Sequence, residues 1–184
     1  MDSRQALDQI NYMQQLLEDT RVRAADQHPF LILWGIIWMI GYTADIFLRG
    51  PLSGLIWLPL AVGGIIANMV IGKRQSQGRP ETPLSKRMMW LNIISFSMLF
   101  LLPMVIGIRN ENSLSAFFPF FVGFIYVLNG IFIGREMIMI GLWMMVTGIV
   151  ALFVAPPMLY LWLAIAGGGG LLTSGILMRR QVQP

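Results

Sequence analysis

The chain has 184 residues, of which 56% are hydrophobic and 12% charged, and its formal net charge is +4. So few charged side chains could not cover a soluble globule of this size, which argues against a soluble domain and predicts a membrane protein. The sequence contains no cysteine, which excludes disulfides, thiol catalysis and iron–sulfur ligation within it.

The first 29 residues are polar, and their pattern predicts a cytoplasmic amphipathic helix that is not a secretory signal peptide. Ile10, Met13 and Leu17 fall on one apolar stripe of this helix, at spacings of three and four residues. The segment is net acidic, whereas helices that lie on anionic lipid are usually rich in Lys and Arg. We therefore expect the stripe to dock against protein, either the chain's own loops, a second copy or a separate soluble partner.

Six apolar stretches follow, each close to the twenty or so residues that an α-helix needs to cross a hydrocarbon core. They predict an all-α, polytopic transmembrane domain over 30–180, with spans at 30–48, 55–72, 88–108, 114–133, 137–154 and 158–178. The helices are expected to form three tandem hairpins, at 30–72, 88–133 and 137–178. Residues 73–87 contain one Gly and two Pro and are predicted to be a basic cytoplasmic linker.

This topology places eleven Lys and Arg residues on the side of both termini and only Arg49 and Arg109 on the other side. Cytoplasmic loops carry such an excess of basic residues, so both termini are predicted to be cytoplasmic, in a bacterial-type plasma (inner) membrane. Topology then accounts for the basic charge, and no direct contact with nucleic acid is expected.

Part of the sequence is repeated. The stretch that begins at Trp57 matches the stretch that begins at Trp162, 105 residues later, and the same offset aligns Trp38 with Trp143. Ten identities fall within the 45 positions from 30 to 74, and rare residues such as Trp and Pro are among them. A fixed offset of this kind indicates repeated structure. We interpret the hairpins as copies with the same orientation, related by rotation about the membrane normal.

Glycines mark the middle of the second and sixth predicted spans, as the pair Gly63 and Gly64 and as the run Gly167, Gly168, Gly169 and Gly170. Small residues let two membrane helices approach until their backbones touch, so one interpretation is packing. The alternative is that the run lets the sixth helix unwind and expose backbone groups to a ligand. In both cases we expect the glycines of the two helices to meet or to line a cavity near the bundle centre.

Three polar residues within the spans are further candidates. Asp45 lies near the outer end of the first span and four residues before Arg49, which favours an ion pair over a proton- or cation-binding role. Asn68 shares a helix face with Gly64 and is interpreted as a hydrogen-bonding group between helices, with a substrate contact as the alternative. Asn129, in the fourth span, would add polar lining to a cavity.

No cofactor, metal site or catalytic residue is predicted. The fourteen methionines are expected to pack as flexible apolar side chains. The single histidine cannot supply a metal cage or a bis-histidine haem within one chain, and no phosphate-binding Gly loop followed by Lys and Ser or Thr is present. The remaining charged groups are placed like ordinary interface charges, so an enzyme is not expected.

Two functional hypotheses follow. The first is a non-catalytic membrane subunit or sensor whose N-terminal helix engages a soluble partner or a second copy. The second is a small-solute permease, channel or importer binding subunit with a site in the middle of the membrane, between the second and sixth helices. In size and span count the chain is similar to the substrate-binding subunits of energy-coupling-factor vitamin importers, a similarity of format that carries no residues across.

Overall fold

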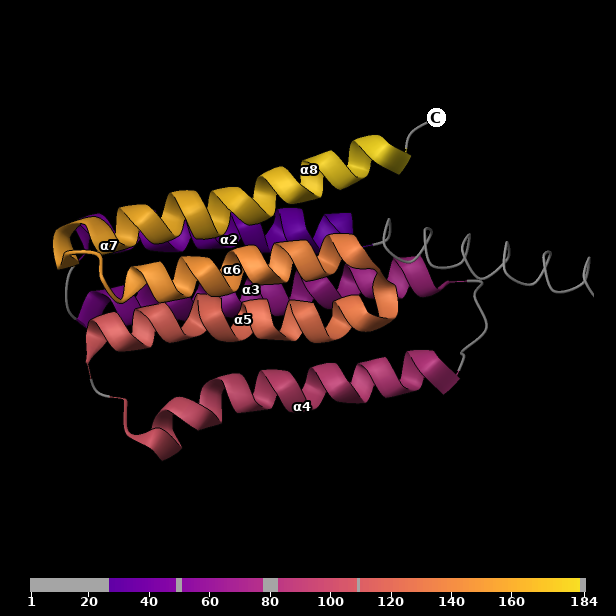
Figure 1. Ribbon diagram of the computed structural model, residues 1–184, viewed down its shortest axis with the longest axis horizontal. Helices are drawn as coiled ribbons and strands as arrows, with labels where there is room; N and C mark the ends of the chain where they lie inside the picture. Colours follow the sequence, from indigo (N-terminus) through magenta and orange to yellow (C-terminus); the bar gives the residue numbers. More distant parts are fainter. Residues whose placement is uncertain (1–26, 49–50, 78–82, 109, 183–184) are drawn as a thin grey trace, which may run out of the picture.

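The computed structural model describes residues 27–48, 51–77, 83–108 and 110–182, and these residues form helices without any strand (Figure 1). The helices are α2 (His28–Phe47), α3 (Pro51–Ser76), α4 (Pro83–Ile106), α5 (Glu111–Ile133), α6 (Arg135–Ala151), α7 (Pro156–Trp162), the π-helical η1 (Leu163–Gly169) and α8 (Gly170–Val182). The predicted all-α class is confirmed for this part of the chain. The predicted docking stripe of Ile10, Met13 and Leu17 lies outside it.

Five helical segments are long and apolar enough to cross a membrane: His28–Phe47, Leu55–Gln75, Lys86–Ile106, Asn112–Ile133 and Met158–Arg180. The last of these runs through α7, η1 and α8. The fifth predicted span, 137–154, corresponds to α6. This helix has 17 residues and ends at Ala151, because Leu152 and Phe153 already form a turn.

Proline, asparagine and glycine set the helix ends. Pro29 lies in the first turn of α2 and Pro156 begins α7, where a missing N–H removes no helical hydrogen bond. The Asn110 side chain caps α5 by accepting a hydrogen bond of 3.0 Å from the Asn112 N–H. Gly134 is the whole connection between α5 and α6, and its φ of 147° is one that residues with side chains rarely adopt.

The most extensive helix contact lies between α5 and α6, and small residues line it. Ala116, Gly123 and Gly130 recur every seven residues on α5, as Gly141 and Gly148 do on α6. A Cβ added to Gly148 would lie 2.7 Å from the carbonyl oxygen of Ala116. The two backbones therefore touch, as small residues allow in membrane helices.

The second helix pair is α2 against η1 and α8. A Cβ on Gly35 would lie 2.9 Å from the carbonyl oxygen of Gly168, and one on Gly175 would lie 3.0 Å from that of His28. We call the continuous helix formed by α7, η1 and α8 the last rod. Seven residues forward along α2, from His28 to Gly35, correspond to seven residues back along the last rod, from Gly175 to Gly168. The two are therefore antiparallel. The first and last described helices pack together through glycine.

These pairs cross the boundaries of the predicted hairpins. α5 and α6 belong to the hairpins 88–133 and 137–178, and α2 and α8 belong to the first and the third. Within the hairpin 88–133, the contact between α4 and α5 is much less extensive than that between α5 and α6. The hairpins are therefore not the units of packing, and the repeat stays a prediction.

The helices α3 and α4 lie at the edges of the bundle. α3 packs on α2 and α4 packs on α5, and Figure 1 shows α4 along one side. Only 6% of the candidate span in α3 and 11% of that in α4 is buried. Large apolar side chains such as Leu58, Met69 and Phe100 point outward, as expected of helices surrounded by lipid tails.

One end of the bundle carries a group of exposed basic side chains, which we name the basic end: Lys73, Arg74, Lys86, Arg87, Arg135, Arg179 and Arg180. In Figure 1 the end of α3, the start of α4, the start of α6 and the end of α8 all lie on this side. At the opposite end, the described residues include no Lys or Arg. Arg49 and Arg109 lie outside the described ranges.

Candidate functional site

Three helices meet around Gly167, in η1. A Cβ on Gly167 would lie 3.1 Å from Cε3 of Trp38 in α2 and 4.0 Å from Cγ2 of Thr147 in α6. Trp38 and Thr147 are both buried. At this position the absence of a side chain lets an indole ring and a threonine close on the η1 backbone from two sides.

The expected meeting of the two sets of glycines does not occur. Nothing lies within 4 Å of a Cβ on Gly63, and one on Gly64 would meet Ile37 and Trp34 of α2. Gly168 also faces α2, because a Cβ there would lie 2.7 Å from the backbone nitrogen of Met39. One glycine from each set, Gly64 and Gly168, therefore packs against α2. Direct contact between the glycines of the second and sixth helices, one of the two predicted alternatives, is therefore not found, and a sequence repeat does not reveal which helix each copy packs against.

The glycine run does not unwind, but it changes the helix. Over Leu163–Gly169 the backbone is π-helical, and the Gly170 N–H bonds to the carbonyl of Gly167, three residues back. In an α-helix that N–H would bond to Ala166. The Ala166 carbonyl instead accepts a hydrogen bond of 2.9 Å from Nε1 of Trp143 in α6. Short π-helical segments within α-helices are often found at functional sites.

Gly170 makes this hydrogen bond sterically feasible. A Cβ on Gly170 would lie 2.6 Å from Trp143 Nε1, so a side chain there would displace the indole. A second indole also links α6 to the last rod, with the donor on the last rod. Trp162 Nε1 in α7 donates to the carbonyl of Thr147 in α6 at 3.1 Å. Trp143 of α6 and Trp162 of α7 thus fix α6 against η1 and α7.

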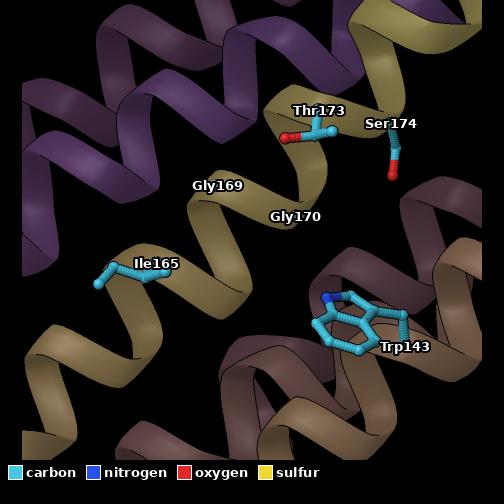
Figure 2. A pocket seen from close by; sticks show the side chains of 6 residues that line it. All are labelled: Trp143, Ile165, Gly169, Gly170, Thr173 and Ser174. Atoms are coloured by element: carbon cyan, nitrogen blue, oxygen red, sulfur yellow. The ribbon is translucent and has the colours of Figure 1, made fainter.

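A shallow hollow of about 420 Å³ lies beside this contact. It is lined by Trp143, Ile165, Gly169, Gly170, Thr173 and Ser174. Figure 2 shows the Trp143 ring beside the turn from Gly169 to Ser174 on the other rod, with Ile165 one turn earlier. The lining is apolar apart from an indole and two hydroxyl groups, and it includes no charged residue. The hydroxyls of Thr173 and Ser174 follow Gly169 and Gly170 by four residues each, a spacing that could have revealed this surface from the sequence.

Asp45 joins α2 to α3. Its side chain is 3% exposed, and its Oδ2 accepts a hydrogen bond of 2.8 Å from Trp57 Nε1. The Trp57 ring lies over Gly41 and packs edge-on against Tyr42, with ring centroids 5.0 Å apart. The indole was not foreseen as a partner of Asp45. Arg49, the predicted partner, lies outside the described residues.

The two asparagines make separate contacts between helices. Asn129 Nδ2 donates to Asn92 Oδ1 at 2.9 Å, and Asn92 Nδ2 donates to Asn129 Oδ1 at 3.2 Å, which joins α5 to α4. Each amide also donates to a carbonyl of its own helix, at Ile125 and at Met88. Asn68 Oδ1 accepts a longer hydrogen bond of 3.4 Å from Trp34 Nε1, between α3 and α2.

The candidate residues therefore do not form one site. Asp45, Asn68 and Asn129 belong to three different helix contacts, and none of them lines the hollow beside Trp143. Among the described residues, every buried side-chain nitrogen and oxygen has a hydrogen-bond partner, and no three His, Cys, Asp or Glu side chains cluster as metal ligands would. The contacts of the candidate residues are those of helix packing.

Comparison with known proteins found no matching protein family, no matching curated protein and no matching solved structure.

Proposed function

We infer that the chain is a non-catalytic subunit or sensor of the plasma membrane, spanning it six times with both termini in the cytoplasm. Residues 1–29 are its contact with a soluble partner or a second copy. Five helices of suitable length and composition support the membrane location. The basic end supports the orientation, because exposed Lys and Arg residues gather on the cytoplasmic side of membrane proteins.

The observation that carries this proposal is the closed packing at the helix crossings. Glycine and alanine bring α5 against α6 and α2 against the last rod until backbone meets backbone. The polar groups between α4 and α5 bond to each other and to their own helices. Such a bundle is suited to holding a soluble segment at a membrane surface, whereas a solute path needs polar groups that are available to the solute.

The apolar stripe of the N-terminal segment provides the test. Replacing Ile10, Met13 and Leu17 with Ser should remove a co-purifying partner or change the oligomeric state, while the membrane-embedded protein stays folded. Asn11 and Gln15 lie on the opposite face of the helix that the spacing predicts, so changing both to Ser is the matched control. The proposal fails if deletion of 2–26 alters neither the partners nor the oligomer.

A second candidate is a permease, channel or importer binding subunit for a small solute. The hollow beside the π-helical turn favours it, although the hollow lies between α6 and the last rod and not where the sequence placed a site. Replacing Thr173 with Val and Ser174 with Ala would remove both hydroxyls and change little else. Loss of uptake or of a retained ligand from a folded protein would support this function. Asp45→Asn would alter the pH dependence of transport only in a proton-coupled carrier.

A further inference from the structure

We propose that the basic end binds the head groups of anionic phospholipids. This inference rests on the membrane-spanning part of the proposed function and is independent of what residues 1–29 contact. It concerns the seven exposed side chains named above, which come from four different helices. Phosphatidylglycerol is the probe that represents this chemistry, since its head group carries a phosphate with one negative charge.

Contacts inside the bundle bring these side chains to one level. The hydrogen bond between Trp34 and Asn68 aligns the start of α2 with the end of α3, next to Lys73 and Arg74. The contact of Gly175 with the His28 carbonyl places the end of α8 beside the same start of α2. The paired amides of Asn92 and Asn129 align the start of α4 with the end of α5. Four helices therefore present their basic residues on the same side (Figure 1).

The depth of these residues matches that of lipid phosphates. Three neighbouring pairs lie at the ends of candidate spans: Lys73 with Arg74, Lys86 with Arg87, and Arg179 with Arg180. Each pair follows or precedes an apolar stretch by a helical turn or less, and Lys and Arg at such positions extend their charge toward the interface. A span that fills the hydrocarbon core thus places the pair within reach of the head groups.

Four of the basic residues, Lys73, Arg74, Arg179 and Arg180, lie in the last turns of α3 and α8, where the helix dipole favours positive charge, but the other three are not explained in this way. Lys86 and Arg135 fall within the first turns of α4 and α6, where the helix dipole disfavours positive charge, and Arg87 follows directly after Lys86. Glu136 is the only exposed acidic side chain described at this end. Seven basic residues and one acidic residue give the described part of this end a net positive charge, which attracts anionic groups.

The acidic N-terminal segment is the other candidate for this surface, but its charge is too small. Residues 1–26 hold five acidic residues and three arginines, a formal charge of −2. That charge offsets only part of the net positive charge of the basic end, whereas the lipid surrounding the spans can supply anions in excess. Juxtamembrane Lys and Arg residues each strengthen binding to an anionic surface about fivefold.

The experiment measures lipid binding by the purified full-length protein, using native mass spectrometry with phosphatidylglycerol and phosphatidylcholine at equal concentrations. We expect phosphatidylglycerol to bind in preference, and Arg179→Gln with Arg180→Gln to lower the preference about 25-fold. Arg179→Lys with Arg180→Lys keeps the charge and should keep most of the preference. Because the double variant leaves the interior contacts of α8 untouched, a folded protein is expected, and its unfolding temperature in detergent verifies this.

Equal binding of the two lipids by the full-length protein would overturn the proposal. So would a preference that appears only after residues 2–26 are deleted, because the acidic segment would then cover the basic end. Neither result bears on partner docking by Ile10, Met13 and Leu17, which is measured separately. If the protein fractionates without membranes or detergent, the membrane assignment itself fails, and this outcome is distinguishable from the other two.

Discussion

Gly123 and Gly141 face each other across the contact between α5 and α6. A Cβ on Gly123 would lie 2.5 Å from the carbonyl oxygen of Gly141, and a Cβ on Gly141 would lie 2.6 Å from that of Gly123. Each glycine therefore occupies a position where no other residue fits without separating the helices. Gly134 alone connects the two helices, and so short a connection requires them to lie this close together.

Replacing Gly123 or Gly141 with Ala should lower the free energy of unfolding by about 1–3 kcal/mol, because the added methyl group meets backbone that cannot rotate away. The measurement is unfolding of the detergent-solubilised protein in a series of SDS mole fractions. Gly72→Ala is the control, since nothing lies within 4 Å of its Cβ position. There, alanine should be neutral or stabilising by up to about 1 kcal/mol through helix propensity. Equal destabilisation at all three positions would contradict the assigned contact.

Two neighbouring residues of the glycine run, Gly168 and Gly169, differ in how closely other atoms surround them. A Cβ on Gly168 would lie 2.7 Å from the backbone nitrogen of Met39, whereas the nearest atom to one on Gly169 is 3.8 Å away. Gly168→Ala should therefore destabilise the protein by about 1–3 kcal/mol, and Gly169→Ala should be tolerated. Thermal unfolding of the two purified variants tests this. A greater loss for Gly169→Ala would mean that the run is not packed against α2 as described.

The hydrogen bond from Trp57 to Asp45 should stabilise the attachment of α3. Trp57→Phe removes a donor to a buried carboxyl group and should cost about 1–3 kcal/mol. Trp34→Phe removes the longer bond to Asn68 and should cost less, and Trp90→Phe, at an exposed position on α4, should be close to neutral. Fluorescence-detected thermal unfolding ranks the three. If Trp57→Phe ranks with Trp90→Phe, the bond does not stabilise the fold.

The amide pair between α4 and α5 is suited to a double-mutant cycle. Asn92→Ala and Asn129→Ala should each destabilise the protein, and the double variant should lose less than the two losses together. Hydrogen bonds between membrane helices have coupling energies of about 0.6–2 kcal/mol, which is the range expected here. Within the described part of the chain, the Ser97 hydroxyl donates to the Ile93 carbonyl of its own helix, so a cycle between Ser97→Ala and Asn129→Ala should show no coupling. Additive losses for Asn92 and Asn129 would refute the pairing.

The sequence was sufficient to locate the helices because helix positions follow from local signals. Apolar runs set their length, and residues such as Pro156 and Gly134 set their ends. The partner of each helix is not a local property. Gly63 and Gly168 occupy matched positions in the sequence repeat, yet Gly168 packs on α2 while nothing lies within 4 Å of a Cβ on Gly63, and the repeat did not indicate this difference.

Part of the packing could have been read from the sequence and was missed. Ala116, Gly123 and Gly130 on one span, and Gly141 and Gly148 on the next, are spaced by seven residues, which marks a continuous face of small residues. The partner of Asp45 was less accessible, because Arg49 is near in sequence while Trp57 becomes near only when α3 folds back. The matched tryptophans Trp57 and Trp162 do share one behaviour, since each donates to the helix before its own.

The last prediction concerns the π-helical turn. Trp143→Phe leaves the Ala166 carbonyl without its indole donor, and Gly170→Ala pushes the indole away from the same carbonyl. Both changes remove the same hydrogen bond, from Trp143 to the Ala166 carbonyl. Each should therefore destabilise the protein by about 1–3 kcal/mol, and the double variant should lose little more than either single variant. Hydrogen exchange at the amides of Leu163–Gly169 should rise in all three relative to the unchanged protein. Ile165→Val, which alters the same turn without touching the indole bond, is the control and should leave exchange unchanged. If the losses are additive and exchange does not rise, Trp143 does not stabilise the π-helical turn.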